Sequence, residues 1–190
     1  MKSFFSFLMF FVPLVVCARD TRTYLYKKRV VIYNPRNEQR DTISSYFYLK
    51  RDKQRLYLSE GSVSAKLLGA SANYIGELSI NAKQELIWSY QKQNIIIHSR
   101  SDSITTDYDG ITQYLFVKGT VYYSGIDTVI NGHLCAKFIR HFSGNAGRDI
   151  PGYETEEYFD TKEQIFVFVR IIYRKPYREL IVELVNWKQQ

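Results

Sequence analysis

The sequence contains few of the residues that mark disulfide-bonded, glycosylated or disordered proteins. Its 190 residues include two cysteines, four prolines and ten glycines, and no Asn-x-Ser/Thr sequon occurs. Cys17 lies in the N-terminal apolar segment, so the rest of the chain has only Cys135 and holds no internal disulfide. So little proline and glycine excludes a long disordered tract. The missing disulfide and sequon favour a bacterial envelope over a eukaryotic secretory route.

The motifs of several enzyme classes are also missing. There is no Gly-x-Ser-x-Gly elbow and no phosphate-cradling glycine-rich loop. His133 is the only histidine near Cys135, because His141 would lie about 20 Å away along an extended strand. A buried structural thiol therefore explains Cys135 better than a nucleophile does, and two ligands on one strand face do not make a zinc site. We expect no enzyme, no catalytic or metal site and no cofactor.

Acidic residues form two small groups without a clear counterpart. One group consists of Glu154, Glu156, Glu157 and Asp160, and the other of Asp102, Asp107 and Asp109. A glycosidase needs two carboxylates that face each other across a cleft, and a calcium loop needs a 12-residue ligand pattern. The sequence shows neither, so both groups are interpreted as solvated turn residues.

Basic residues exceed acidic ones but are not concentrated. There are 26 Lys and Arg against 19 Asp and Glu, a net charge of +7, and the two signs alternate from end to end. Without a basic block or a nucleic-acid motif we expect no nucleic-acid partner. A solvated basic surface is the simplest interpretation, and peripheral contact with an anionic membrane comes next.

The N-terminal segment has the pattern of a secretory signal. Lys2 precedes an apolar run from Phe4 to Val16, which is short for a membrane span and fits a signal h-region. Val16-Cys17-Ala18 suits an ordinary signal peptidase, which would leave Arg19 as the first residue. We therefore expect residues 1–18 to be a signal peptide and residues 19–190 to form a single antiparallel β-domain.

Two other fates of this segment stay open. Leu14-Val15-Val16-Cys17 resembles a lipobox, so the signal peptide could end before Cys17, which would then be lipidated. Val16 stands where a lipobox has Gly, Ala or Ser, and ordinary cleavage is favoured for that reason. An uncleaved anchor is the third alternative, because the downstream flank is the more basic one.

The rest of the chain alternates between apolar and polar residues with the period of a half-buried strand. Residues 133–142 show it most clearly, with Leu134, Ala136 and Phe138 on one face and His133 and Cys135 on the other. Short polar turns join such segments, which predicts sequential antiparallel neighbours. Strands are expected over residues 23–33, 42–49, 55–59, 86–90, 95–99, 133–142, 153–159, 165–173 and 179–187, with one or two more within 111–124.

Nine to eleven strands of this kind predict an all-β or mostly β fold, an antiparallel meander that forms a curved sheet or half-barrel. Residues 64–83 can be interpreted in two ways. Alanines near 64–73 favour a short helix, whereas Gly69 and Ser71 oppose it. One or two short helices are therefore part of the expectation.

An excess of aromatic residues suggests an apolar site. Tyr (16) and Phe (12) far outnumber Trp (2), and residues 165–169 (IFVFV) are apolar on both faces of a strand. Either protein covers both faces, or something else covers one of them. A sheet that curls without closing tightly can enclose a cavity. The side chains expected to line it are Phe138, Phe166, Phe168 and Trp187.

Two local patterns carry a family resemblance. They are SYFYLKRDKQRL at 45–56, a strand, a charged turn and a strand, and DTVINGHLCAK at 127–137, followed by Tyr158-Phe159-Asp160. Together they resemble the unclosed β-barrel proteins of bacterial envelopes related to the periplasmic lipoprotein carriers, and secreted families common in Bacteroidetes, over most of residues 23–187. The resemblance implies a half-barrel with an apolar concave face, a lipid or acyl-chain ligand and no catalytic residue.

Two functions follow as hypotheses. The first is an exported envelope protein, periplasmic, tethered to the outer membrane or secreted, that binds an apolar ligand in its curved sheet without catalysis. The second is a structural or protein-interaction domain of the envelope or secreted fraction with no small-molecule ligand. A carrier needs a cavity lined by residues such as Phe138 and Phe166, whereas a structural domain packs these side chains solidly.

Overall fold

Every regular element that the structure describes is a β-strand. The computed structural model describes residues 21–34, 39–60, 72–106, 118–144, 151–174 and 177–189. Alternating β-branched and aromatic residues suit the pleat of these strands. The strands are β1 (Thr21–Asn34), β2 (Gln39–Asp52), β3 (Arg55–Glu60), β4 (Asn73–Ile80), β5 (Glu85–Tyr90), β6 (Gln93–Ser99), β7 (Ile104–Thr106), β8 (Gly119–Ile130), β9 (His133–Phe142), β10 (Tyr153–Asp160), β11 (Ile165–Arg174) and β12 (Tyr177–Gln189).

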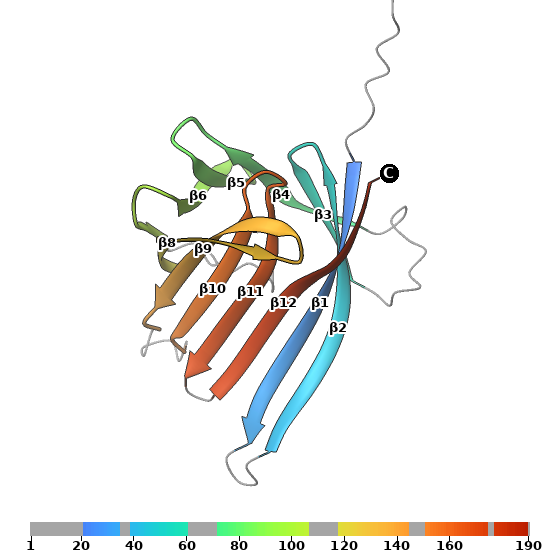
Figure 1. Ribbon diagram of the computed structural model, residues 1–190, viewed down its shortest axis with the longest axis vertical. Helices are drawn as coiled ribbons and strands as arrows, with labels where there is room; N and C mark the ends of the chain where they lie inside the picture. The colour runs from blue at the N-terminus through green and yellow to red at the C-terminus, as the bar shows by residue number, and fades with distance from the viewer. Residues whose placement is uncertain are drawn as a thin grey trace, which may run out of the picture.

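The twelve strands form one antiparallel sheet in the order β6-β5-β4-β3-β2-β1-β12-β11-β10-β9-β8-β7. The first and last strands pair along most of their length, from Arg22 opposite Gln189 to Ile32 opposite Arg178. This pairing joins the two halves of the chain in the middle of the sheet. The sheet curls into a nearly closed barrel (Figure 1), and its unsealed seam lies between the edge strands β6 and β7. This arrangement confirms the predicted all-β antiparallel meander.

The predicted number of strands needs correction, and the predicted helix falls mostly outside the described residues. The described residues contain twelve strands and no helix, whereas nine to eleven strands were expected. The difference arises at β4 and the three-residue β7, which were not expected. Most of the helix expected near residues 64–73 lies outside the described residues, because the description omits 61–71. Asn73 already begins β4. Strand pairing decides β4: its residues 77–80 lie opposite 86–89 of β5, which turns an ambiguous pattern into a strand.

The strands differ in length, and this divides the barrel into two halves. Figure 1 shows β3 to β6 in the upper part only, whereas β9 to β12, β1 and β2 continue downward. In the upper half, the buried hydroxyl of Tyr26 in β1 donates past β12 to the Phe166 carbonyl oxygen of β11 (2.8 Å). Arg22 and Arg51 close the upper end by binding the β10–β11 turn at Glu163 and Gln164.

The doubly apolar strand 165–169 has protein over both faces at its start. A bulge places Phe159 opposite Phe166 and Tyr158 opposite Phe168, so Val167 is an extra residue in β11. The β8–β9 hairpin crosses β10 and β11 (Figure 1), and the Asn131 side chain at its turn donates to the Leu184 carbonyl oxygen of β12 (3.4 Å). Ile165, Phe166 and Val167 are consequently all buried.

Candidate functional site

A fully buried ionic cluster lies in the upper half of the barrel. Glu157 of β10 accepts hydrogen bonds from Thr155 (2.6 Å) and from Arg140 Nε of β9 (2.8 Å), and His98 Nε2 of β6 lies 2.5 Å from its second oxygen. The exposed fractions are only 2% for His98, 4% for Glu157 and 1% for Arg140. Burial of this kind requires that each charge be paired, and the Arg140–Glu157 pair meets that requirement.

The environment sets the charge of both titratable partners. Burial opposes ionisation of Glu157, but the Arg140 charge and the hydrogen bonds from His98 and Arg140 outweigh it and hold the pKa of this carboxyl well below its usual range. Burial lowers the pKa of His98 and Arg140 lowers it further, against the opposing effect of Glu157. His98 is therefore neutral at pH 7 and donates from Nε2 to an ionised Glu157. Its Nδ1 is buried and has no hydrogen-bond partner among the described residues.

The same cluster joins the two sides of the seam. Arg140 Nη2 donates to the carbonyl oxygen of Ile97 on the edge strand β6 (3.0 Å), and the adjacent His98 reaches Glu157. At the surface, Arg100 binds both carboxylate oxygens of Asp127 in β8 (2.7 and 2.6 Å). Side chains from β8, β9 and β10 thus hold β6 in place where the sheet has no strand pairing. The cluster is not accessible to solvent, so a structural role explains it better than general acid–base catalysis does.

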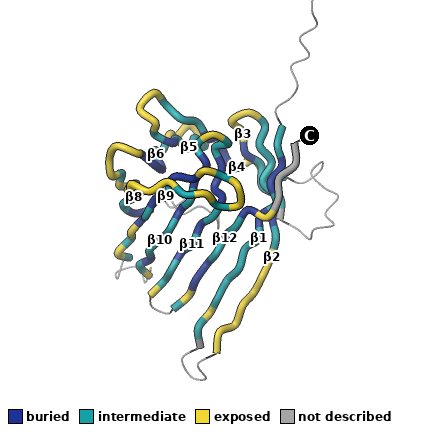
Figure 2. The backbone as a smooth tube through the Cα atoms, viewed as in Figure 1, coloured by how far each residue is buried: buried dark blue, intermediate teal, exposed yellow. Residues whose placement is uncertain are grey.

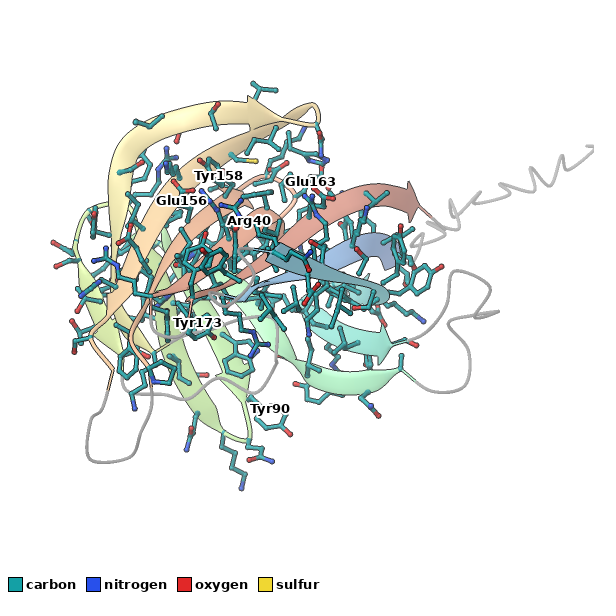
Figure 3. The ribbon with its side chains drawn as sticks, turned by 90° about the horizontal axis from the view of Figure 1, so that it is seen from below. Arg40, Tyr90, Glu156, Tyr158, Glu163 and Tyr173 are labelled. Carbon is teal, nitrogen blue, oxygen red and sulfur yellow. The ribbon has the colours of Figure 1, made fainter. Side chains whose placement is uncertain are left out.

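Two of the four expected lining residues lie together in this packed region. The His98 ring stacks on Phe138 (centroids 4.0 Å apart) and meets Phe166 edge-on (5.4 Å). Phe168 lies elsewhere: it pairs with Tyr158, which points to the opposite face of β10 from Phe159. Figure 3 shows Tyr158 on the side of the β8–β9 hairpin. Trp187 belongs to β12 and lies opposite Tyr24, but the structure does not describe its side chain. Cys17 is outside the described residues.

The thiol considered as a nucleophile is buried in this fold. Cys135 is completely buried, and burial, together with the nearby Asp160 carboxylate, raises its pKa to about 12. His133 Nδ1 is bonded to Asp160 Oδ2 (2.8 Å). Asp160 also accepts the backbone N–H groups of Lys162 and Glu163, so the three groups fasten the β10–β11 turn beneath the β8–β9 hairpin. No set of three or more potential metal ligands occurs among the described residues.

The lower half of the inner face is more open. Tyr26 marks the inner face of β1, so Val30 and Ile32 point to the same side because strand side chains alternate. Ile43 of β2 lies directly opposite Val30. We call these three residues the aliphatic strip. Val30 is half-buried, Ile32 in the row below it is 42% exposed, and Ile43 beside Val30 on β2 is 61% exposed.

The aliphatic strip continues into a buried apolar wall. Val30 lies opposite Leu180 of β12, and Leu180 lies opposite Ile171 of β11. Both wall residues are buried, at 3% and 0% exposed. Ile43, Val30, Leu180 and Ile171 thus form one apolar row over four strands, roughly 14 Å across at about 4.8 Å per strand spacing. Figure 2 shows the change from buried to exposed residues toward the lower ends of β1 and β2.

Aromatic side chains form the next row below. Tyr173, Tyr153 and Phe142 come from β11, β10 and β9 and lie side by side, with ring centroids 5.7 and 5.2 Å apart. We call them the aromatic row; Figure 3, seen from below, shows Tyr173 inside the ring of strands. A cavity of about 370 Å³ adjoins Phe142 and Tyr153 and is lined by residues 141–143, 151–154 and Arg174. That volume is at the small end of the range for ligand sites.

Another cavity, of about 690 Å³, lies beside the β2–β3 turn and β4. Asp52, Lys53, Gln54, Arg55 and Glu77 line it. This lining is charged or polar throughout, so the cavity does not suit an apolar ligand.

The sequence did not predict the burial or the grouping of several of these residues. Glu157 and Asp160 were interpreted as solvated turn residues, but they are 4% and 5% exposed because Arg140, His98 and His133 approach them from other strands. In the sequence, Arg140 shares a strand face with Ala136 and Phe138 and interrupts its apolar pattern, which is the only local signal of that cluster. The aliphatic strip could not be separated from core residues, since period-two alternation does not say which part of a face stays uncovered.

No family model matches the chain, and no curated protein matches it in sequence. Two solved structures are similar to it at low identity. One is a putative outer membrane lipoprotein-sorting protein domain from Vibrio parahaemolyticus, at 9% identity over 90% of this chain and 86% of that one, with a TM-score of 0.26. The other is a DUF1329 family protein from Desulfovibrio piger, at 11% identity over 92% and 87%, with a TM-score of 0.29. At these scores neither likeness indicates what the chain binds, and its function must be inferred from its own geometry.

Proposed function

We propose that the protein is a non-catalytic, exported envelope protein that binds a lipid or acyl chain on the lower inner face of its barrel. The observation that carries the proposal is the aliphatic strip. Ile32 and Ile43 are large aliphatic residues that stay exposed on the concave side of a sheet. Ile43 is in line with the buried Leu180–Ile171 wall, and Ile32 lies one row below it. A bound apolar chain along this row would remove that surface from water, at about 25 cal/mol per Å².

The binding region differs from the one expected from the sequence. Phe138 and Phe166 pack against His98 in the closed upper half, so the proposed ligand site lies one or more rows below them. The aromatic row extends the same apolar surface toward β9. The role of Trp187 stays a prediction.

Export remains part of the proposal and rests on residues 1–18. The described residues contain no helix of the length and hydropathy needed to cross a membrane. Intact mass spectrometry of the natively exported protein separates the alternatives for the leader. A chain that starts at Cys17 and carries acyl groups indicates a tethered lipoprotein, and a bare chain that starts at Arg19 indicates ordinary cleavage.

Native mass spectrometry of the same material tests the ligand. We expect a co-purified apolar adduct on the wild-type protein and its loss from Ile43→Asp, because a carboxylate at this position would have to be buried against the chain. Thr42→Asp is the matched control: Thr42 is the exposed neighbour of Ile43 on the opposite face of β2, and its variant should keep the adduct. Absence of any adduct, together with failure of the purified protein to bind a fluorescent long-chain alcohol, would overturn the proposal.

A second function is favoured by the β8–β9 hairpin. Val129 and Leu134 form a cross-strand pair at its end and are 66% and 62% exposed. Exposed apolar pairs of this kind occur at protein–protein contacts. A ligand-free native protein whose defined complex is lost on Val129→Ser and Leu134→Ser would favour a structural or interaction domain instead.

A further inference from the structure

The lower rim of the inner face brings a cation onto each end of the aromatic row. Arg178 of β12 lies opposite Tyr173, with its guanidinium carbon 5.9 Å from the ring centroid. Lys118, just before β8, holds its ammonium 5.3 Å from the centroid of Phe142. Tyr153, between the two rings, donates its hydroxyl to the Lys118 carbonyl oxygen (2.6 Å) and so fixes the position of this residue.

Arg178 also adjoins the aliphatic strip. It lies directly opposite Ile32 in the β1–β12 pairing, one row below Val30 and Leu180. A ligand whose chain follows the strip would therefore bring its polar end to Arg178 and to the edge of the aromatic row. Arginine presents a planar fork of donors that matches a carboxylate or phosphate group.

Negative charge is scarce at this rim. Arg178 is exposed, and no carboxylate of the described residues lies within ion-pair distance of its guanidinium. Glu154 is engaged by Arg174 (3.2 Å), and Asp41 lies beyond Ile32, two strand spacings away from Arg178. The chain as a whole carries a net charge of +7. The rim is therefore complementary to an anion.

We propose that the ligand is an anionic amphiphile, whose carboxylate or phosphate binds at Arg178 and the Lys118 side of the aromatic row while its chain lies on the aliphatic strip. This inference rests on the proposed function, since it names the chemical class of the ligand at the same site. It also explains why cations lie over Tyr173 and Phe142 without a carboxylate partner at Arg178: the rings hold the cations at the edge of an apolar surface.

Equilibrium binding to the full mature protein tests the inference. Three probes share one chain length: a long-chain fatty acid, the matching lysophosphatidic acid and the matching neutral alcohol. We expect at least one anionic probe to bind about tenfold more tightly than the alcohol, the factor that one charge-assisted hydrogen bond supplies. The stronger of the two anions identifies a carboxylate or a phosphate headgroup.

Two variants locate the effect. Arg178→Gln should remove the preference for the anion and leave the affinity for the alcohol unchanged. Lys162→Gln makes the same charge change on an exposed side chain in the β10–β11 turn, at the other end of the barrel, and should keep the preference.

Each contrary result has a separate meaning. Equal binding of acid and alcohol by the wild-type protein, or equal loss of preference in both variants, overturns the inference while the proposed function stands. Failure of all three probes to bind overturns the proposed function, and the inference with it.

Discussion

Removal of the charge on Glu157 should destabilise the fold more than any surface substitution. In Glu157→Gln the amide has nearly the size of the carboxyl, so no cavity forms. Arg140 would keep its bond to the Ile97 carbonyl oxygen but lose a counter-ion at 2.8 Å, in a site where its exposed fraction is 1%. Breaking a buried pair from one side costs about 3–5 kcal/mol, because the remaining charge is left uncompensated.

The expected loss is large enough to measure by thermal and urea unfolding. For a domain of this size, about 2–4 °C per kcal/mol corresponds to a fall in Tm of roughly 6–20 °C. Glu183→Gln is the matched control, because Glu183 pairs with Arg29 at the surface (3.1 Å, side chains 29% and 36% exposed). Such a pair contributes about 1 kcal/mol or less to the free energy of unfolding.

A double variant separates charge from packing. Arg140→Met combined with Glu157→Leu replaces the pair by apolar side chains and should recover most of the stability lost in Glu157→Gln. If Glu157→Gln unfolded at the same temperature as Glu183→Gln, the buried cluster would not hold the seam as the geometry indicates. If the double variant were no more stable than Glu157→Gln, shape and not charge would be the cause.

Three further predictions concern pH, thiol reactivity and a glycine. Folding lowers the pKa of His98 from 6.5 and that of Glu157 from 4.5, so both groups contribute stability that is complete above these values and is lost as the pH falls. Urea midpoints should therefore drop from pH 6.5 downward, and His98→Gln should remove the part of this drop that occurs above pH 5. An unchanged profile would contradict this reasoning. Cys135, with its pKa near 12, should react with a maleimide only on unfolding in urea, and labelling of the native protein at the rate of a free thiol would refute its burial. Gly76→Ala should cost more than about 1 kcal/mol in urea unfolding, because Gly76 has φ of +134° and an added Cβ would collide with the Trp88 indole and the Ser89 carbonyl oxygen. A neutral result would contradict this reasoning.

The strand pattern was readable from the sequence where alternation is regular. Residues 133–142 form β9 with the predicted bounds, and 165–173 and 153–159 each differ from β11 and β10 by a single residue. The prediction was weakest at 64–83 and at β7, since a three-residue strand has too few positions to show a period. At β4 and at β7, pairing with a neighbouring strand, which is not local information, decides the conformation.

The candidate site was predictable only in its chemical character. An aromatic-rich curved sheet does contain an apolar inner face, but Phe138 and Phe166 belong to its closed half, and Phe168 points away from them. Which residues stay uncovered depends on the unequal lengths of strands that are far apart in sequence. The short β3 to β6 fill only the upper half, and the longer β1 and β2 leave Ile32 and Ile43 exposed.

By itself, the sequence determined the strand periodicity, the antiparallel connections and the shortage of catalytic motifs, because each is a property of neighbouring residues. Only the tertiary structure decided that Arg140, Glu157 and His98 meet across the seam and that Arg178 joins Ile32 and Tyr173 at the lower rim. The residues in each group come from different strands, and curling of the sheet places them within contact distance. Charge pairing in a dry interior then explains the first group, and the uncovered edge of an apolar surface explains the second.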